Sequence, residues 1–222
     1  MKTILITGHD TGIGKTWVTR FIATCLTERK EMVQVIKPVE TGIDADASHA
    51  SGDIFTIIKT LDPRHISGFT LNSFKAPLAP LAAGALEGKE ISIEGILQQV
   101  NNLPVMEWRL IETAGGLAVP LDISGADGRD LAIELKVDFI VLVVQNRLGA
   151  INQARLLEAY SPKNPPTIGL WLNDTHPRDP LVTASNLSAL RSMRSPLWSH
   201  QGYRNLRPDF CCAPFLEFSS GK

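Results

Sequence analysis

Cysteine is scarce in this chain, and its few cysteines form no metal-binding or disulfide pattern. Cys25, Cys211 and Cys212 are the three cysteines among 222 residues, and no Cys-x-x-Cys pair occurs. A disulfide framework is typical of an even number of regularly spaced cysteines in an oxidising compartment. We therefore expect a reducing compartment and predict a cytoplasmic protein.

Long apolar runs and blocks of one charge are missing as well. The longest apolar run, Phe139 to Val144, is far shorter than the roughly 20 residues that cross a bilayer. The N-terminal residues carry no leader pattern. The 22 basic and 23 acidic residues give a net charge of −1, and no basic stretch is long. Nucleic acid binding needs a concentrated positive face, so we expect neither a membrane nor a nucleic acid as partner.

The chain also lacks internal repeats, low-complexity segments and a recognisable nucleophile–histidine arrangement. Its 44% hydrophobic and 20% charged residues are ordinary for a globular enzyme. A chain of 222 residues can form one α/β domain. We predict a single domain over residues 1–222, in which the pattern after about residue 195 does not indicate a definite structure.

One stretch near the N-terminus carries the strongest signal, Gly8-His9-Asp10-Thr11-Gly12-Ile13-Gly14-Lys15-Thr16. It follows a short apolar run and leads into a helix-compatible segment, which is the context of a phosphate-binding loop. Loop N–H groups and the helix dipole favour anions, Lys15 would reach the β- and γ-phosphates, and Thr16 would bind Mg²⁺. Five residues separate Gly8 from Gly14, whereas the usual pattern has four.

Apolar and polar segments alternate in a way that predicts strands followed by helices. We expect strands at residues 4–6, 32–37, 108–111, 137–144 and 167–172. We expect helices at residues 17–28, 53 onward, 80–86, 92 onward, 149–160 and 181–191. Pro38 should end the second strand, and residues 61–77 read as irregular. The fold class predicted is α/β, P-loop NTPase-like, with a mostly parallel sheet and helices on both faces.

Lys37 ends the second strand within Lys37-Pro38-Val39-Glu40-Thr41-Gly42. If that strand neighbours the loop strand, the lysine points into the crevice at the carboxyl ends of the strands, where ligands bind. Thr41 supplies a hydroxyl to the same turn, which then forms a shelf for a substrate. The alternative is a solvated lysine that closes a strand.

Glu112 follows the apolar strand 108–111, where phosphate-loop enzymes carry an acidic ligand of Mg²⁺ or an anchor for water. Mg²⁺ prefers hard oxygen ligands, so Thr16, Glu112 and one further carboxylate suffice. We select Asp53 as that carboxylate, with Asp44 and Asp46 as competitors. The alternative for Asp53 is an N-cap of the helix that it precedes.

Three further turns offer binding groups. The backbone of Ala114-Gly115-Gly116 permits close approach of an anionic intermediate. Residues 149–152 begin a helix whose free N–H groups can receive a carboxylate, or they are an ordinary helix start. Asn173 can read the edge of a nucleobase, because an amide both donates and accepts, or it is a turn residue.

These groups together resemble the dethiobiotin synthetase family. The matching stretches follow the family's order over about 170 residues and are 8–16, 37–42, 112–116 with 119–121, 149–152 and 173–174. The resemblance implies that CO₂ and an amine of 7,8-diaminononanoate form a carbamate, which ATP phosphorylates. The second amine then closes the ureido ring as phosphate leaves.

The resemblance also implies residue roles. Lys37, Lys15 and Thr11 would be catalytic. The substrate would contact Thr41, Gly115, Gly149, Ala150 and Asn152. ATP would contact Gly12, Ile13, Gly14, Lys15, Thr16, Trp17, Asp53, Glu112 and Asn173, and Mg²⁺ would be the cofactor, held by Thr16, Asp53 and Glu112. Family members are homodimers in which the 149–152 turn receives the substrate carboxylate across the interface.

The sequence departs from the family pattern at three places. His9 replaces a small polar residue, Leu81 stands where many members have histidine, and residues from 195 onward match poorly. Family members complete the adenine pocket with that last region.

Two rival classes remain at this stage. The first is a ParA/MinD-like switch ATPase, whose loop usually carries a second lysine where this chain has Thr11 and which often binds membrane through an amphipathic helix. The second is a cobyrinate-type synthetase, which is normally joined to a glutaminase domain that 222 residues cannot include.

Overall fold

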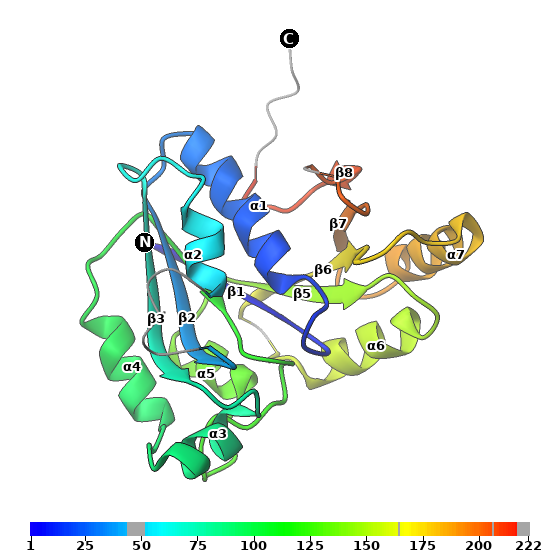
Figure 1. Cartoon of the computed structure of the whole chain (residues 1–222). Coiled ribbons are helices and arrows are strands. Elements are labelled where there is room, and N and C mark those ends of the chain that lie inside the picture. The colour runs from blue at the N-terminus through cyan, green and yellow to red at the C-terminus, as the bar shows by residue number, and fades with distance from the viewer. Residues whose placement is uncertain (44–51, 164, 206, 217–222) are drawn as a thin grey trace.

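The computed structural model describes residues 1–43, 52–163, 165–205 and 207–216. One eight-stranded sheet runs through it in the order β3-β2-β4-β1-β5-β6-β7-β8 (Figure 1). The first seven strands along the chain are parallel, and β8 is antiparallel to β7. The strands are β1 Lys2–Gly8, β2 Val33–Thr41, β3 Ile66–Phe74, β4 Trp108–Glu112, β5 Phe139–Gln145, β6 Thr167–Asn173, β7 Leu197–Gln201 and β8 Phe210–Cys211.

Helices cover both faces of the sheet (Figure 1). They are α1 Lys15–Glu28, α2 Asp53–Ile58, α3 Pro80–Glu87, α4 Ile93–Asn101, α5 Gly128–Glu134, α6 Ala150–Tyr160 and α7 Pro180–Arg191. Each lies close to its expected place except α5, which the sequence pattern did not suggest. Within the described residues, no helix has the length and apolar character needed to cross a membrane. The eight-stranded, mostly parallel sheet with helices on both faces confirms the predicted α/β fold.

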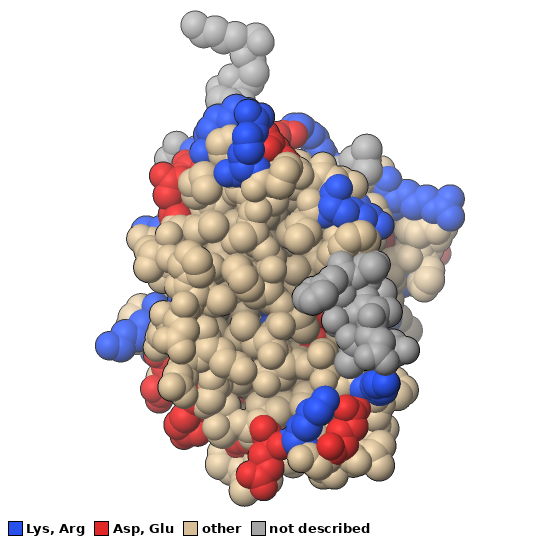
Figure 2. Space-filling view, turned by 60° about the vertical axis from the view of Figure 1, so that its left-hand side comes forward, with Lys and Arg blue, Asp and Glu red and all other residues tan. Residues whose placement is uncertain are grey.

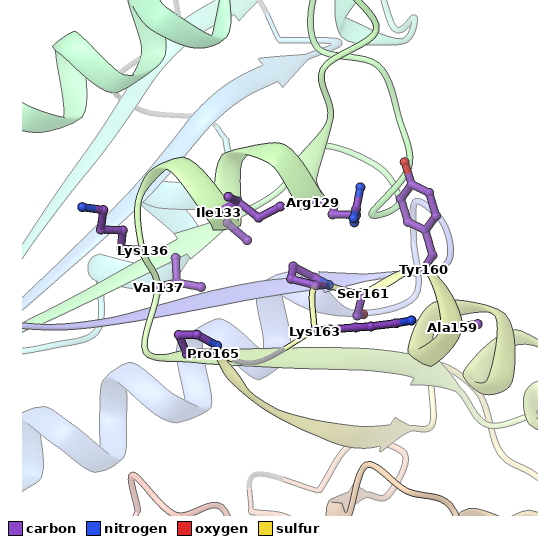
Figure 3. A pocket seen from close by; sticks show the side chains of 11 residues that line it. Arg129, Ile133, Lys136, Val137, Ala159, Tyr160, Ser161, Lys163 and Pro165 are labelled. Carbon is purple, nitrogen blue, oxygen red and sulfur yellow. The ribbon is translucent and has the colours of Figure 1, made fainter.

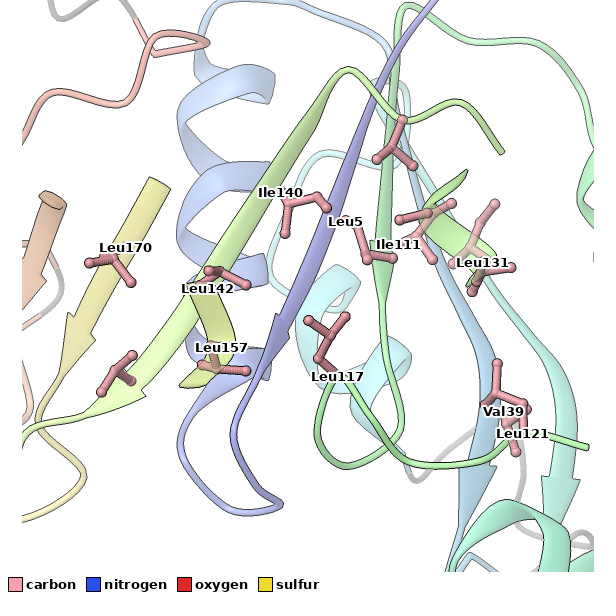
Figure 4. Packing of buried hydrophobic residues seen from close by; sticks show 14 of the residues in the cluster. Leu5, Val39, Ile111, Leu117, Leu121, Leu131, Ile140, Leu142, Leu157 and Leu170 are labelled. Carbon is pink, nitrogen blue, oxygen red and sulfur yellow. The ribbon is translucent and has the colours of Figure 1, made fainter. Parts of the chain in front are cut away.

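The alternation of side chains along each strand divides the core into two clusters. Ile4 and Ile6 of β1 pack with α1 and α2, whereas Leu5 packs with α4, α5 and α6. Figure 4 shows the second cluster, in which Leu5, Ile111 and Leu142 project from neighbouring strands. Successive residues of a strand point to opposite faces, so a strand covered on both sides needs a continuous apolar sequence.

The strand β3 corrects the expectation that residues 61–77 are irregular. It pairs with β2 from Ile66 to Phe74 and forms the edge of the sheet. Its side chains are mostly half-buried, so the apolar alternation that identifies a strand is weak there. Gly68 is required, because a Cβ at that position would lie 2.4 Å from the Ile54 side chain of α2.

The face of the molecule in Figure 2 carries charges of both signs around a largely uncharged centre.

Pro38 does not end the second strand as expected, because β2 continues to Thr41. The neighbouring strand β4 pairs with β2 only as far as Ile36, so beyond that point β2 is paired on one side. A proline lacks a backbone donor and is tolerated where one side of the strand is free. The strand that carries Lys37 is also not next to the loop strand, since β4 lies between β2 and β1.

The region after residue 195 contains β7 and the short β8, and it extends the sheet beyond β6. At the centre of β6, Gly169 allows the indole of Trp198 in β7 to lie directly against the strand. A Cβ at residue 169 would be 2.0 Å from Trp198 Cδ2, and Trp198 is almost fully buried.

We expect Gly169→Ala to lower the free energy of unfolding by about 1 to 3 kcal/mol, because the new methyl group overpacks the site. Urea denaturation monitored by tryptophan fluorescence measures the change. Gly95→Ala in α4 is the matched control, since its Cβ would meet only the Ser92 hydroxyl, at 3.2 Å, and alanine favours a helix. Equal stability of Gly169→Ala and the parent chain would contradict this packing.

Candidate active site

The turn between β1 and α1 presents unpaired backbone N–H groups at a helix start. Gly12 and Gly14 have φ angles of 73° and 91°, in the left-handed region that side chains avoid. Gly14 is the N-cap of α1 and no side chain caps the helix. The first N–H groups of a helix lack internal partners, and the dipole there is positive. This turn is therefore built to bind an anion such as a phosphate.

Lys15 lies in the first turn of α1, and its side chain crosses the loop. Its Nζ donates to the carbonyl of Asp10 at 2.7 Å, and the residue is buried. Burial lowers the pKa of Lys15 to about 8, while the attraction of Glu112 opposes the shift and the charge of Lys37 adds to it. The free protein thus holds Lys15 close to the point where it loses its proton.

Glu112 at the end of β4 accepts hydrogen bonds from three side chains. Lys37 Nζ and Thr16 Oγ1 lie 2.9 Å and 2.8 Å from Oε1, and Thr19 Oγ1 lies 2.8 Å from Oε2. The carboxylate is fully buried. A buried charge is costly unless it is paired and hydrogen-bonded, and both conditions are met here. Glu112 therefore joins α1 to β2 through β4.

Lys37 forms ion pairs with both Glu112 and Asp53, so it is not the solvated lysine of the alternative interpretation. Burial alone lowers the pKa of Lys37, but attraction to Glu112 and Asp53 outweighs it, and the pKa rises above its ordinary value. Asp53 is the first residue of α2, and Gly52 is the N-cap, so the alternative N-cap role for Asp53 is wrong.

The three residues expected to hold Mg²⁺ lie together around Lys37. Thr16 and Lys37 both donate to Glu112 Oε1, and Lys37 also donates to Asp53. The side chains of Thr16, Asp53 and Glu112 offer hard oxygen atoms, and the two carboxylates already pair with one cation, the Lys37 ammonium. This set of oxygen ligands fits Mg²⁺, which keeps several waters. The competing Asp44 and Asp46 lie outside the described residues.

Two members of this cluster were not expected. Thr19 follows Thr16 by three residues, a helical spacing that places both on the face toward Glu112. Glu40 is buried; its Oε1 accepts the backbone N–H of Asp53 at 2.7 Å and its Oε2 the hydroxyl of Thr70 at 3.2 Å. Burial raises the pKa of Glu40. The spacing Thr16–Thr19 was a signal in the sequence, whereas the contact of Glu40 depends on the placement of α2.

The 113–117 segment lies against the phosphate loop. Leu117 N–H donates to the Gly8 carbonyl at 2.8 Å. Gly115 has a φ of 65°, and a Cβ there would lie 3.6 Å from Thr11 Oγ1. Thr11 and Gly115 are thus close neighbours. Thr41 is half-buried at the end of β2.

The turn before α6 is separate from this cluster. Gly149 has a φ of 92°, is the N-cap and has no side-chain cap. Ala150 is buried, and Asn152 is exposed. Within the part of the chain that the structure describes, no hydrogen bond or ion pair joins residues 149–152 to Lys37, Glu112 or the loop.

Asn173 holds the phosphate loop in place. Its Nδ2 donates to the carbonyl of Ile13 at 2.8 Å, and a Cβ on Gly14 would lie 2.1 Å from that nitrogen. A cavity of about 310 Å³ opens beside it. Its lining combines Gly12, Gly14, Trp17 and residues 173–176 with residues 201–205, which follow β7. The region after residue 195 therefore does contribute to a pocket at the loop.

The His9 side chain lies near the backbone of Val143 and the side chain of Arg147. Both ring nitrogens are shielded from solvent and neither is paired. Burial lowers the pKa of His9, and the charge of Arg147 lowers it further. His9 therefore lies in the loop as a neutral side chain near neutral pH.

Comparison with known proteins identifies the relatives of this chain. The model of a family described as an AAA domain matches residues 2–196. An ATP-dependent dethiobiotin synthetase from Mycobacterium avium is 34% identical over 197 residues, which cover 87% of this chain and 84% of the relative. Another from Anaeromyxobacter is 37% identical over 164 residues, which cover 70% and 69%.

Solved structures agree in fold at low sequence identity. A ParA family ATPase from Chlorobium tepidum has a TM-score of 0.55 at 13% identity, covering 92% of this chain and 84% of its own. The MinD cell division protein of Aquifex aeolicus has a TM-score of 0.51 at 15% identity, covering 92% and 83%. At these identities the likeness concerns the fold alone.

We expect Thr19→Val to destabilise the protein by about 1 to 3 kcal/mol, because a buried oxygen of Glu112 loses its donor while the side-chain shape is kept. Chemical denaturation measures the loss. Thr19→Ser is the matched control, since it restores the hydroxyl. If the valine variant is as stable as the serine variant, the hydroxyl does not hold Glu112.

Proposed function

This chain belongs to the ATP-dependent dethiobiotin synthetase family, and we propose that it converts 7,8-diaminononanoate, CO₂ and ATP into dethiobiotin, ADP and phosphate. The single observation that carries the proposal is the position of Lys37. Its ammonium lies between Glu112 and Asp53, beside the phosphate loop. A phosphoryl-transfer site needs such fixed charges more than it needs a protein nucleophile.

The proposed reaction has three steps. An amine nitrogen of the substrate attacks the carbon of CO₂ and loses a proton, which gives a carbamate. A carbamate oxygen attacks the γ-phosphorus of ATP, the bond to the β-phosphate oxygen breaks, and ADP leaves. The second amine then attacks the carbamate carbon and loses a proton, phosphate leaves with the electrons of the C–O bond, and the ureido ring is closed.

Lys37 neutralises the negative charge that moves between the carbamate and the phosphoryl group. Its raised pKa keeps it protonated, because Glu112 and Asp53 stabilise the ammonium. It therefore acts as a fixed positive charge and not as a base. Thr11, Thr41 and the backbone at Gly115 orient the diamine end on the other side of the loop.

Lys15 and the N–H groups of Gly12, Ile13, Gly14 and Thr16 bind the phosphates of ATP. Thr16, Asp53 and Glu112 hold Mg²⁺, which when bound neutralises charge on the β- and γ-phosphates. In this structure both carboxylates pair with Lys37, and the hydroxyl of Thr16 donates to Glu112. Asn173 and Trp17 lie at the cavity that receives the nucleobase.

The separation of residues 149–152 from Lys37 supports a homodimer with its active site at the interface. No side chain caps the start of α6, and the N–H of Ala150 donates to the Arg147 carbonyl at 3.0 Å. In a dimer, Gly149, Ala150 and Asn152 of one copy receive the substrate carboxylate bound at the other copy. A cytoplasmic location belongs to the same proposal, and the three cysteines are free thiols.

A switch ATPase is the rival reading, because ParA and MinD proteins share this fold. Thr11 occupies the loop position of their second lysine, and the relatives from Mycobacterium avium and Anaeromyxobacter, at 34% and 37% identity, are synthetases. The two classes differ in what ATP turnover requires.

We expect ADP release to require Mg²⁺, bicarbonate and 7,8-diaminononanoate together, and the product to have the mass of dethiobiotin. A coupled ADP assay and mass spectrometry measure both. A diamine without the carboxylate is the control substrate. Equal ATP turnover with and without the diamine would refute the synthetase and favour the switch.

We expect Lys37→Ala to lower turnover by several orders of magnitude while ATP binding largely survives, because the loop and Lys15 remain. Calorimetry measures binding, and the ADP assay measures turnover. Lys59→Ala, an exposed lysine beside Phe55, is the control. Wild-type turnover in Lys37→Ala would remove this residue from the mechanism.

We expect ATP binding above pH 8 to take up a proton at Lys15. The free protein lowers the pKa of this lysine to about 8, and the phosphates raise it again, so binding weakens as the pH rises through 8 to 9. Calorimetry in buffers of different ionisation enthalpy counts the protons. Lys15→Met should abolish the uptake, and unchanged uptake in that variant would assign it to another group.

A further inference from the structure

A cavity of about 750 Å³ lies at the edge of the sheet opposite the phosphate loop. Its lining includes Val137, just before the amino end of β5, and Pro165, just before that of β6. The phosphate loop, in contrast, follows the carboxyl end of β1. The cavity is large enough for a small ligand and lies apart from the proposed active site.

One end of this cavity is positively charged. Arg129 and Lys163 lie at the end beside the Tyr160 ring, whereas the amine of Lys136 points out of the cavity (Figure 3). Among the described residues, neither Arg129 nor Lys163 has an ion-pair partner. The guanidinium carbon of Arg129 lies over the face of Tyr160, 5.6 Å from the ring centre.

Three carboxylates on the elements around the cavity already accept hydrogen bonds from other groups. Asp127 caps α5 through the N–H groups of Arg129 and Asp130, and it accepts the Tyr160 hydroxyl at 2.5 Å. Asp130 accepts the backbone N–H of Asp127, and Glu158 accepts that of Ser195. Among the residues that the structure describes, no acidic side chain lines the cavity. The two cations are therefore available to an external anion.

Helix stability does not account for Arg129. It lies in the first turn of α5, directly after Gly128, where the positive end of the helix dipole disfavours a cation. A bound anion between Arg129 and Lys163 removes that unfavourable interaction. Negative charge in the cavity would therefore stabilise Arg129, which the dipole of its own helix does not.

The other end of the cavity is apolar. Ala132, Ile133, Val137 and Pro165 line it, and Ile133 is 46% exposed. Figure 3 places Val137 and Pro165 away from the charged end, with Ile133 between Arg129 and Lys136. An elongated ligand with an anionic head at Arg129 and an apolar chain along these residues satisfies both ends.

We propose that this cavity is a binding site for small aliphatic carboxylates. The carboxylate binds Arg129 and Lys163, and the hydrocarbon chain covers Ile133 and Val137. Guanidinium and ammonium groups both form charge-assisted hydrogen bonds with carboxylates. Because the cavity lies apart from the proposed active site, binding to it does not require catalytic turnover.

Octanoate is the probe, titrated by calorimetry into the full chain saturated with ATP. We expect octanoate to bind, and Arg129→Gln and Lys163→Gln each to weaken the binding at least tenfold. Ile133→Ser should weaken it several-fold, and because Ile133 is half exposed this variant leaves the fold intact. Lys59→Gln, a lysine on a different surface, is the matched control and should bind as the parent chain does.

Octan-1-ol separates charge from apolar contact, and amide chemical shifts locate the bound probe. We expect the alcohol to bind at least tenfold more weakly, and octanoate to shift amides of residues 129–137 and 159–163. Equal affinity of alcohol and carboxylate would overturn the proposal. Unchanged affinity in the Arg129 and Lys163 variants, or shifts confined to residues 11–16 and 149–152, would overturn it as well.

Discussion

The buried carboxylate of Glu112 is the interaction on which the site depends. A fully buried negative charge must be neutralised and hydrogen-bonded, and it obtains its donors from two elements other than its own strand. Thr16 and Thr19 reach it from α1, and Lys37 reaches it from β2. A shift of α1 along the sheet would remove the two hydroxyl donors, and a shift of β2 against β4 would remove the ammonium. The phosphate loop and Lys37 are therefore fixed relative to each other before any ligand binds.

The strand order explains why Glu112 holds this position. The strand β4 lies between β1, which leads into the loop, and β2, which carries Lys37. The carboxyl ends of all three strands meet at one edge, where parallel sheets bind ligands. A residue at the end of the middle strand is the one that can contact side chains arriving from both sides. The chain order β1, β2, β4 conceals this adjacency, because β4 is inserted between two strands that precede it.

The phosphate loop could be predicted from local sequence patterns. Features that depend on contacts between distant residues could not. Strand, glycine turn, lysine and helix follow one another within residues 2–28, so the sequence alone indicated the phosphate site. The wrong assignment of residues 61–77 has a physical cause: β3 is an edge strand whose register comes from β2, and its half-buried side chains show no alternation. Glu40 escaped attention for a related reason, because its partner Asp53 belongs to the next helix.

The two lysines of the site show how the same side chain acquires opposite properties from its surroundings. Lys15 is buried against the loop backbone, and among the described residues no carboxylate forms an ion pair with it, so burial dominates and its pKa falls to about 8. Lys37 is also buried, but Glu112 and Asp53 flank it, and its pKa rises instead. Lys37 therefore carries its charge permanently, as a group that stabilises a transient anion must. Lys15 holds its proton less firmly than Lys37, and phosphates bound at the loop raise its pKa again, so its charge is strengthened when the ligand arrives.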